Sequence, residues 1–177
     1  MHRLFDERRY LIPFRSGLLP QIFTDTLVIG AGVAGLRAAL ASVACGAGSE
    51  AIVLSKSSPE ESNTAWAQGG IAAVMDEKGG DSFESHVRDT LEAGAGLCDE
   101  PAVRAVIAGG PARIAELANW GMRFDLGPTG KVLLGQEGAH SHARILHADG
   151  DATGKELSRC LMERVRATPG VRVFLDC

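Results

Sequence analysis

The sequence predicts an α/β domain built around a parallel sheet, and a strand–helix–strand pattern near its start carries that prediction. The apolar, β-branched segment TDTLVIG (24–30) is followed by a glycine turn, by VAGLRAALASVA (33–44) with apolar residues at helical spacing, and by AIVLSK (51–56). Two consecutive strands joined by a helix require a parallel pair with a right-handed crossover. Near the other end, TGKELSRCLMERVRA (153–167) is an amphipathic helix, and PGVRVFLDC (169–177) turns into a further strand.

The middle of the chain is predicted to begin with a helix after residue 81. Asp81 stands three residues before Glu84, the spacing of a capping box, in which side chains satisfy the first free N–H groups of a helix. Phe83, Val87 and Leu91 then fall on one helical face. We therefore expect a helix that is capped by Asp81 and buries this apolar face.

Two prolines and a tight turn organise the segment that follows. Pro101 and Pro111 are each placed to begin a helix, since proline is favoured in the first helical turn, and the second helix is expected to end at Gly121. MRFD (122–125) and KVLLG (131–135), joined by the turn GPTG, are expected to form a β-hairpin.

Composition and charge narrow the class of protein. A chain of 177 residues, 45% hydrophobic and 23% charged, is long enough for one globular domain with a core. A net charge of −4 offers no basic surface, so we expect no nucleic-acid partner. The 22 glycines, beside two Trp, one Tyr and six Phe, favour a cofactor-binding domain over a protein-binding surface. The cysteines form no C-x-x-C pair and are interpreted as reduced thiols, with no zinc knuckle or disulfide framework: Cys45, Cys98, Cys160 and Cys177.

The first 23 residues differ in character from the rest. Residues 1–23 mix charge, aromatic residues and prolines without periodicity, so we interpret them as an N-terminal extension without an assigned function, and residues 24–177 as the domain. Asp6 and Glu7 interrupt the start, which argues against a secretory signal. The longest apolar run, 26–40, is broken by glycines and an arginine, so we expect no membrane span and a cytoplasmic protein.

The glycine turn, residues 30–35, indicates a dinucleotide site. Gly30-x-Gly32-x-x-Gly35 directly follows a strand and opens a helix, which is the context that the Rossmann-like fingerprint requires. Gly30 permits the tight turn, Gly32 lets the backbone approach a pyrophosphate, and Gly35 lets the helix pack on the strand. The candidate contacts in this turn are Gly30, Ala31, Gly32, Val33, Ala34 and Gly35.

The end of the second strand argues against a plain NAD site. The acidic residue that usually accepts from the ribose hydroxyls is absent, and Ser55 and Lys56 stand there instead. Lys56 could pair with a phosphate or another cofactor oxygen, or it could be a solvated lysine at a strand end. Both interpretations stay open at this point.

Several motifs in a fixed order resemble a known family. "SNTAWAQGGIAAV" follows "VLSK", and "ESHVRDTLEAGAGLCD", "EGAHSHARILHADGDATG" and the closing amphipathic helix come after it. This order resembles the flavoprotein family of succinate dehydrogenase and fumarate reductase, most closely its L-aspartate oxidase branch, from Thr24 to Cys177. The resemblance implies that residues 24–177 are the N-terminal part of a Rossmann-like FAD-binding domain with a parallel sheet, truncated before the family's capping domain.

The resemblance also implies FAD, with its pyrophosphate at the glycine turn and its flavin beside the small-residue loop, residues 63–70. Small side chains there would let backbone N–H groups approach the flavin edge, and Gln68 could add a side-chain hydrogen bond. Asn63 stands where the succinate dehydrogenases carry a histidine that bonds to the flavin, so we expect non-covalent FAD. The candidate contacts in this loop are Asn63, Thr64, Ala65, Trp66, Ala67, Gln68, Gly69 and Gly70.

The stretch QEGAHSHARILHA (136–148) has three competing interpretations. His140 and His142 could ligate a metal, with Glu137 or His147 as a further ligand, although we predict no metal site. The stretch could equally be a hydrogen-bonded loop. The resemblance implies a third role, in which Glu137 faces the active site and orients an amino-acid substrate, because a carboxylate is the natural partner of an ammonium group.

The resemblance implies an enzyme that uses FAD to oxidise L-aspartate to iminoaspartate, with O2 or fumarate as acceptor. This is the first step toward NAD through quinolinate, which makes quinolinate synthase a pathway neighbour. The family's substrate-binding arginines lie beyond Cys177, so we expect the chain alone to bind FAD weakly and not to turn over aspartate. The alternatives are a succinate dehydrogenase or fumarate reductase flavoprotein subunit, and a non-catalytic dinucleotide-binding fragment.

Overall fold

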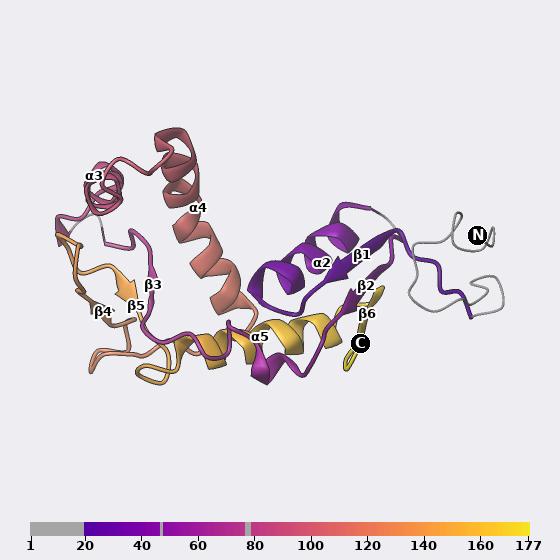
Figure 1. Cartoon of the computed structure of the whole chain (residues 1–177). Helices are drawn as coiled ribbons and strands as arrows, with labels where there is room; N and C mark the ends of the chain where they lie inside the picture. Colours follow the sequence, from indigo (N-terminus) through magenta and orange to yellow (C-terminus); the bar gives the residue numbers. More distant parts are fainter. Residues whose placement is uncertain (1–19, 47, 77–78) are drawn as a thin grey trace.

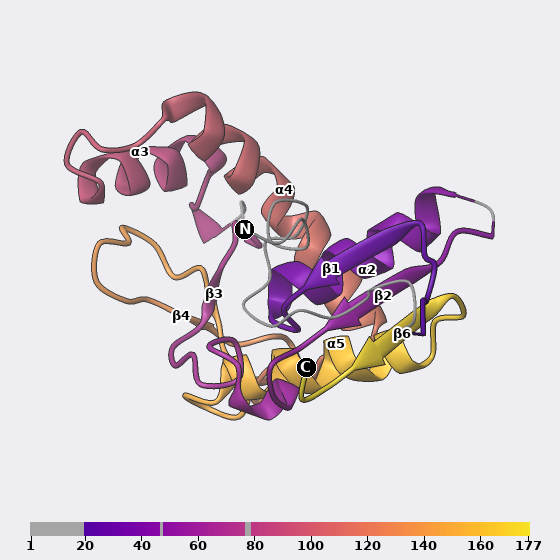
Figure 2. The same ribbon diagram turned by 45° about the vertical axis from the view of Figure 1, so that its right-hand side comes forward.

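A three-stranded parallel sheet forms one half of the structure, a computed structural model that describes residues 20–46, 48–76 and 79–177. Strands β1 (Thr26–Ile29), β2 (Ala51–Leu54) and β6 (Val171–Phe174) lie in the order β1-β2-β6 (Figures 1 and 2). Both pairs are parallel over four residues each. The predicted α/β class and the early strand–helix–strand unit are therefore confirmed, whereas most of the predicted N-terminal extension lies outside the described residues.

Two helices pack against this sheet and against each other. These are α2 (Val33–Cys45) and α5 (Thr153–Arg166), both close to their predicted bounds. The predicted apolar faces are buried, and the core between helices and sheet contains Leu36, Ala39, Leu40, Val53, Leu161 and Val165. Leucines from both helices fill this space, while Ala31, Ala39 and Ala51 are small enough to let the first helix lie close to the strands.

The other half of the structure holds a small antiparallel sheet and two helices. Strands β3 (Ile71–Ala72), β5 (Ile145–Leu146) and β4 (Leu134–Gly135) lie in the order β3-β5-β4. Helix α3 (Phe83–Ala93) lies above this sheet in Figure 1, and α4 (Glu100–Asn119) runs from it toward α5. A short 3-10 helix, η2 (Pro59–Glu61), follows β2. No helix in the described ranges combines the length and apolar character that crossing a membrane needs.

The two halves share a continuous apolar core. A second cluster contains Ala73, Ile114, Met122, Phe124, Leu146 and Cys160. Leu117, Trp120 and Leu157 pack against both clusters, so α4 and α5 join the parallel sheet to the antiparallel one. This junction places the loops of the second half next to the carboxyl ends of the parallel strands (Figure 2).

The predicted capping box at Asp81 is wrong. Ser82 is the N-cap of α3, and its side chain accepts a hydrogen bond from the N–H of Ser85 at 3.1 Å. Ser82 has the extended backbone that a cap requires. Asp81 is buried and binds Arg144 instead. Asp81 pairs with the buried cation and does not cap the helix, because leaving a guanidinium unpaired in the interior costs far more free energy than losing a cap.

The predicted helix start at Pro111 is also wrong, whereas Pro101 does stand in the first turn of α4. The helix runs through Pro111 without interruption. Proline disfavours helical backbone at the preceding residue partly through a clash with its Cβ, and Gly110 has no Cβ. The predicted end at Gly121 is close to the observed end at Asn119.

The predicted hairpin forms over the part nearest its turn, where the N–H of Leu133 in the second predicted strand donates to the carbonyl of Asp125 in the first at 2.9 Å. The N–H of Gly127 donates to the carbonyl of Lys131 at 2.8 Å, and Leu126 forms an isolated antiparallel bridge with Val132. The end of the second predicted strand pairs elsewhere, as β4 with β5. Burial favours that partner, because both residues of β5 are buried.

Gly35 allows α2 to approach the glycine turn, and replacing it should be severe. A Cβ on Gly35 would stand 1.9 Å from the carbonyl oxygen of Gly30, a backbone atom that cannot move aside. We expect Gly35→Ala to lower the free energy of unfolding by about 3 kcal/mol. The matched control Gly109→Ala lies in α4 with open space around the new methyl group, and should raise stability by about 0.5–1 kcal/mol. Thermal unfolding followed by circular dichroism measures both, and equal effects would contradict the prediction.

Candidate cofactor and substrate site

The site begins where the parallel strands end. The N–H of Gly30 donates to the carbonyl of Leu54 at 2.7 Å, and the N–H of Ser55 donates to that of Phe174 at 2.9 Å. The ladder therefore continues past the strand ends and brings the glycine turn beside the end of β2. Lys56 follows there with an exposed side chain, so it is accessible to a ligand on this edge.

The glycine turn has the geometry of a phosphate cradle. Gly30 has φ +106°, a conformation that side chains disfavour, and Gly32 is the N-cap of α2 with no capping side chain of its own. Ala34 and Gly35 have backbone N–H groups in the first turn, where a helix leaves its donors without intrahelical acceptors. The helix dipole adds positive potential at the same place. These features fit the pyrophosphate of a dinucleotide.

Thr64 links the glycine turn to the small-residue loop. The N–H of Val33 donates to Thr64 Oγ1 at 2.9 Å, and a Cβ added at Gly32 would stand 3.3 Å from that oxygen. Thr64 therefore caps α2 from a distant part of the sequence. A dinucleotide bound here would therefore contact the glycine turn and the small-residue loop at neighbouring points.

The small-residue loop is held by α5 and is not a free surface linker. The N–H of Gly154 donates to the carbonyl of Ala67 at 3.2 Å, and a Cβ on Gly154 would lie 2.0 Å from the carbonyl of Thr64. Ser62 Oγ accepts from the N–H of Ala65 at 3.1 Å. The loop still presents large and polar groups outward, since Asn63, Trp66, Ala67, Gln68 and Gly70 are exposed.

Glu137 lies beside the end of this loop. A Cβ on Gly69 would stand 3.9 Å from Glu137 Oε2, so the carboxylate faces the Gly69 backbone. Glu137 Oε1 is 3.2 Å from His147 Nε2, and its side chain remains 46% exposed. The structure thus brings together three sequence-predicted groups from separate segments: the glycine turn, the small-residue loop and Glu137.

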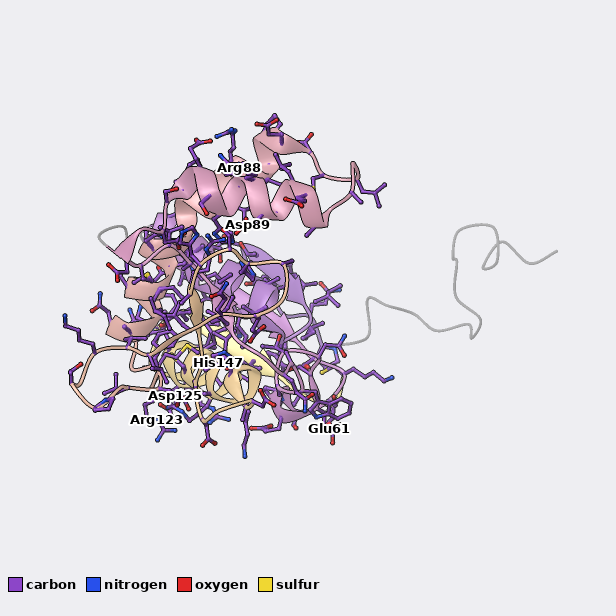
Figure 3. The ribbon with its side chains drawn as sticks, turned by 90° about the vertical axis from the view of Figure 1, so that its left-hand side faces the viewer. Glu61, Arg88, Asp89, Arg123, Asp125 and His147 are labelled. Atoms are coloured by element: carbon purple, nitrogen blue, oxygen red, sulfur yellow. The ribbon has the colours of Figure 1, made fainter. Side chains whose placement is uncertain are left out.

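Arg144 fixes the Glu137 loop, residues 136–144, and sequence reasoning missed it. Its guanidinium is fully buried and donates to both oxygens of Asp81, at 3.0 and 2.6 Å, and to Asp89 at 2.6 Å. The N–H and hydroxyl of Ser141 also donate to Asp89, both at 2.8 Å. Figure 3 shows Asp89 on the side of α3 that faces the rest of the chain. In the sequence, Asp81 and Asp89 look like ordinary acidic residues at the start and in the middle of a helix. Their role as the partners of a buried arginine is seen only in the structure.

The charges of this cluster are set by its hydrogen bonds. Burial works to raise the pKa of Asp89, but hydrogen bonds from Ser141 and Arg144 outweigh it and hold that pKa at about 2. The same balance of burial against hydrogen bonds from Arg144 lowers the pKa of Asp81. Burial, and then the charge of Arg144, lowers the pKa of His86, whose Nδ1 has no partner in the described part of the chain. The two carboxylates are therefore ionised at neutral pH and His86 is uncharged.

His140 and His142 belong to the same cluster. His140 Nδ1 lies 3.3 Å from Arg144 Nη1, and His142 Nδ1 lies 3.0 Å from Ser85 Oγ. Within residues 20–46, 48–76 and 79–177, no group of three or more His, Cys, Asp or Glu side chains is arranged to hold a metal ion. The contacts of these histidines are those of a hydrogen-bonded loop, the second of the three interpretations.

A second buried carboxylate, Glu156, anchors the segment after α4. It accepts from the N–H of Arg123 at 2.9 Å and from Arg159 Nη2 at 2.6 Å. Burial opposes its ionisation, but the hydrogen bonds from Arg159 and Arg123 hold its pKa far below the usual range. Figure 3 shows Arg123 at the edge of the molecule opposite α3.

Together these features define a dinucleotide-binding α/β domain with a half-exposed carboxylate beside its cofactor loop. A family model described as "FAD binding domain" matches residues 25–176, and the chain belongs to this family. The dinucleotide indicated by the glycine turn, which the family resemblance implied to be FAD, is therefore confirmed as FAD.

The most similar relatives include L-aspartate oxidases. The chain is 50% identical over 152 residues to the chloroplastic L-aspartate oxidase of Arabidopsis thaliana and 48% identical over 146 residues to the L-aspartate oxidase of Streptomyces coelicolor. These matches cover 86% and 82% of this chain but 22% and 24% of the relatives, so the chain spans about a quarter of their length. The resemblance stated from the sequence motifs is confirmed.

A solved structure of the quinol fumarate reductase of E. coli has a similar fold. It superposes with a TM-score of 0.81 at 32% identity, over 86% of this chain and 26% of that chain. This similarity confirms the fold expected for the family's FAD-binding domain.

The Arg144 cluster should dominate the stability of the Glu137 loop. We expect Arg144→Met to lower the free energy of unfolding by about 3–5 kcal/mol, because it leaves Asp81 and Asp89 as buried charges without their cation. The matched control Arg113→Met removes an arginine that is 56% exposed, and should change stability by less than about 1 kcal/mol. Urea unfolding measures both variants. Similar losses in the two variants would show that the buried cluster is not the anchor.

Proposed function

We propose that this chain forms the FAD-binding core of an L-aspartate oxidase, which oxidises L-aspartate to iminoaspartate with O2 or fumarate as the final electron acceptor. The observation that carries the proposal is the position of Glu137, whose half-exposed carboxylate faces Gly69 at the end of the small-residue loop. The identity to L-aspartate oxidases supports it.

The residues of the chain divide the binding of FAD between two segments. At the start of α2, the N–H groups of Gly32, Ala34 and Gly35 would hold the pyrophosphate, since that of Val33 donates to Thr64, and Lys56 would pair with a cofactor oxygen at the end of β2. The small-residue loop would line the flavin. When bound, FAD would supply a hydride acceptor for the hydrogen that leaves the substrate Cα. Asn63 has an amide that is not a nucleophile, so FAD is held without a covalent bond.

Glu137 distinguishes amino-acid substrates from their deaminated analogues. Its negative charge attracts the α-ammonium of aspartate, and the same charge repels succinate, whose two carboxylates lack a compensating cation. The side chain that contacts Glu137 is His147, whose Nε2 lies 3.2 Å from Oε1, and the carboxylate remains 46% exposed and thus accessible to a ligand.

The two carboxylates of the substrate need cationic partners, which Glu137 cannot provide. Arg144 is the arginine of the Glu137 loop, but it is buried and fully engaged with Asp81 and Asp89. Following the family resemblance, we propose that arginines of the family's later segments, and not Arg144, bind the substrate carboxylates and that the 177 residues alone bind FAD weakly and do not oxidise aspartate. On the same proposal, iminoaspartate is consumed by quinolinate synthase on the way to NAD.

A second candidate is the flavoprotein of a fumarate reductase or succinate dehydrogenase. The fold similarity to quinol fumarate reductase at 32% identity favours it. The substrates separate the two candidates, since only an amino acid carries the ammonium that Glu137 would bind. A third candidate, a dinucleotide-binding module without catalysis, would bind flavin and show no bleaching with any of these substrates.

FAD binding by the chain tests the cofactor part of the proposal. We expect FAD to bind with quenching of its flavin fluorescence, and Gly32→Val to weaken binding at least about tenfold, because the added side chain blocks the approach of the pyrophosphate. Gly109→Ala serves as the control and should bind FAD as the unsubstituted chain does. Equal affinities for Gly32→Val and the control would rule out the glycine turn as the phosphate site.

Substrate choice tests the role of Glu137. We suggest a chimera in which this chain replaces the matching segment of the Streptomyces coelicolor L-aspartate oxidase. In it, Glu137→Gln should lower kcat/KM for L-aspartate about 10–100-fold through loss of a charge-assisted hydrogen bond, and should weaken the discrimination against succinate. Glu92→Gln on α3, an exposed carboxylate, is the matched control. A chimera that oxidises succinate in preference to aspartate would favour the second candidate.

A further inference from the structure

We propose that His147 is the positioning residue that holds the carboxylate of Glu137 in place, so that the pair, and not Glu137 alone, recognises the substrate ammonium. This inference rests on the proposed function. His147 follows β5 directly. The sequence alone suggested it only as a possible metal ligand.

The ring of His147 is enclosed by two glycines from neighbouring strands. A Cβ on Gly135, in β4, would stand 3.3 Å from His147 Nε2, and a Cβ on Gly70, just before β3, would stand 3.2 Å from Cε1. The carbonyl of His147 accepts from the N–H of Asp125 at 2.8 Å. Both the backbone and the ring are therefore fixed by the small sheet, and the side chain is only 23% exposed.

Glu137 lacks such support from its own surroundings. It lies in the Glu137 loop with an exposed side chain, and within the described ranges its ion-pair contact is that of Oε1 with His147 Nε2, at 3.2 Å. A long, exposed carboxylate side chain samples several rotamers unless a partner restricts it. The imidazole provides that restriction through Oε1 and leaves Oε2 free for a ligand, while the whole carboxylate faces Gly69, with its two oxygens 3.9 and 4.0 Å from the position of an added Cβ.

The protonation of the imidazole decides what the pair can bind. Nε2 and Glu137 Oε1 are in close contact at 3.2 Å, and a neutral ring that carries its proton on Nε2 can direct that proton toward the carboxylate and leave the full negative charge for an ammonium ligand. A ring with its proton on Nδ1 would have no hydrogen to donate at 3.2 Å. The proposal therefore requires the Nε2–H form, which is a property of the 177-residue chain itself and does not depend on catalysis.

The first test measures this form directly. Long-range ¹H–¹⁵N NMR of the unsubstituted chain should show the proton of neutral His147 on Nε2. Glu137→Gln should shift the His147 ring nitrogens, whereas the control Glu92→Gln should leave them unchanged. An Nδ1–H ring, or a ring that does not respond to Glu137→Gln, would overturn the proposal.

The second test uses the chimera with the Streptomyces coelicolor segment replaced. His147→Leu should raise KM for L-aspartate about tenfold with a smaller change in kcat, since binding of the ammonium and not the chemistry is affected. His147→Gln places an amide N–H near the position of Nε2 and should restore KM to within about threefold of the unsubstituted value. Gln and Leu variants with equal KM would contradict a positioning role.

The two tests separate the inference from the proposed function. A chimera without activity on aspartate in its unsubstituted form would defeat the proposed function, and the NMR result would still decide whether His147 holds Glu137. A chimera that is active on aspartate but indifferent to His147→Leu would defeat the inference and leave the proposed function standing.

Discussion

The buried guanidinium of Arg144 is the interaction on which the candidate site depends. A fully buried cation is tolerated only when carboxylates compensate it, and Asp81 and Asp89 do so from the start and the middle of the α3 region. Arg144 also closes the Glu137 loop, because its N–H donates to the carbonyl of Gly135 at 3.0 Å. The loop is thus clamped at its base to β4 and to α3, and Glu137 is carried between these two attachments.

Close backbone approaches assemble the rest of the site. Gly35 lets α2 meet the turn that precedes it, and Gly154 lets α5 meet the small-residue loop. Gly70 leaves room for β5 and for the ring of His147. In each case a methyl group would collide with a neighbouring segment, so glycine permits contacts between elements that side chains would keep apart. The cofactor loop is consequently a packed element of the fold.

The carboxylates of the chain fall into two groups by their surroundings. Asp81 and Glu156 are buried and Asp89 is half-buried; all three are paired with arginines, and against the effect of burial their pKa values are lowered by hydrogen bonds, which for Asp89 come from Ser141 as well as Arg144. Glu137 is half-exposed and faces an imidazole and a glycine. The charges of the first group are neutralised by arginines within the protein, whereas the negative charge of Glu137 is accessible to a ligand. This contrast supports a recognition role for Glu137.

The sequence by itself determined the features that depend on short spacings. The strand–helix–strand unit, the glycine turn and the face of α5 follow from residues a few positions apart, because hydrophobic periodicity and glycine placement are local properties. Only the tertiary structure decided the partners of charged residues, such as Asp81 with Arg144, 63 positions apart, and Arg123 with Glu156, 33 positions apart. It also decided that α4 continues through Pro111. Long-range pairing follows from which elements the topology brings together, and a single sequence does not display that information.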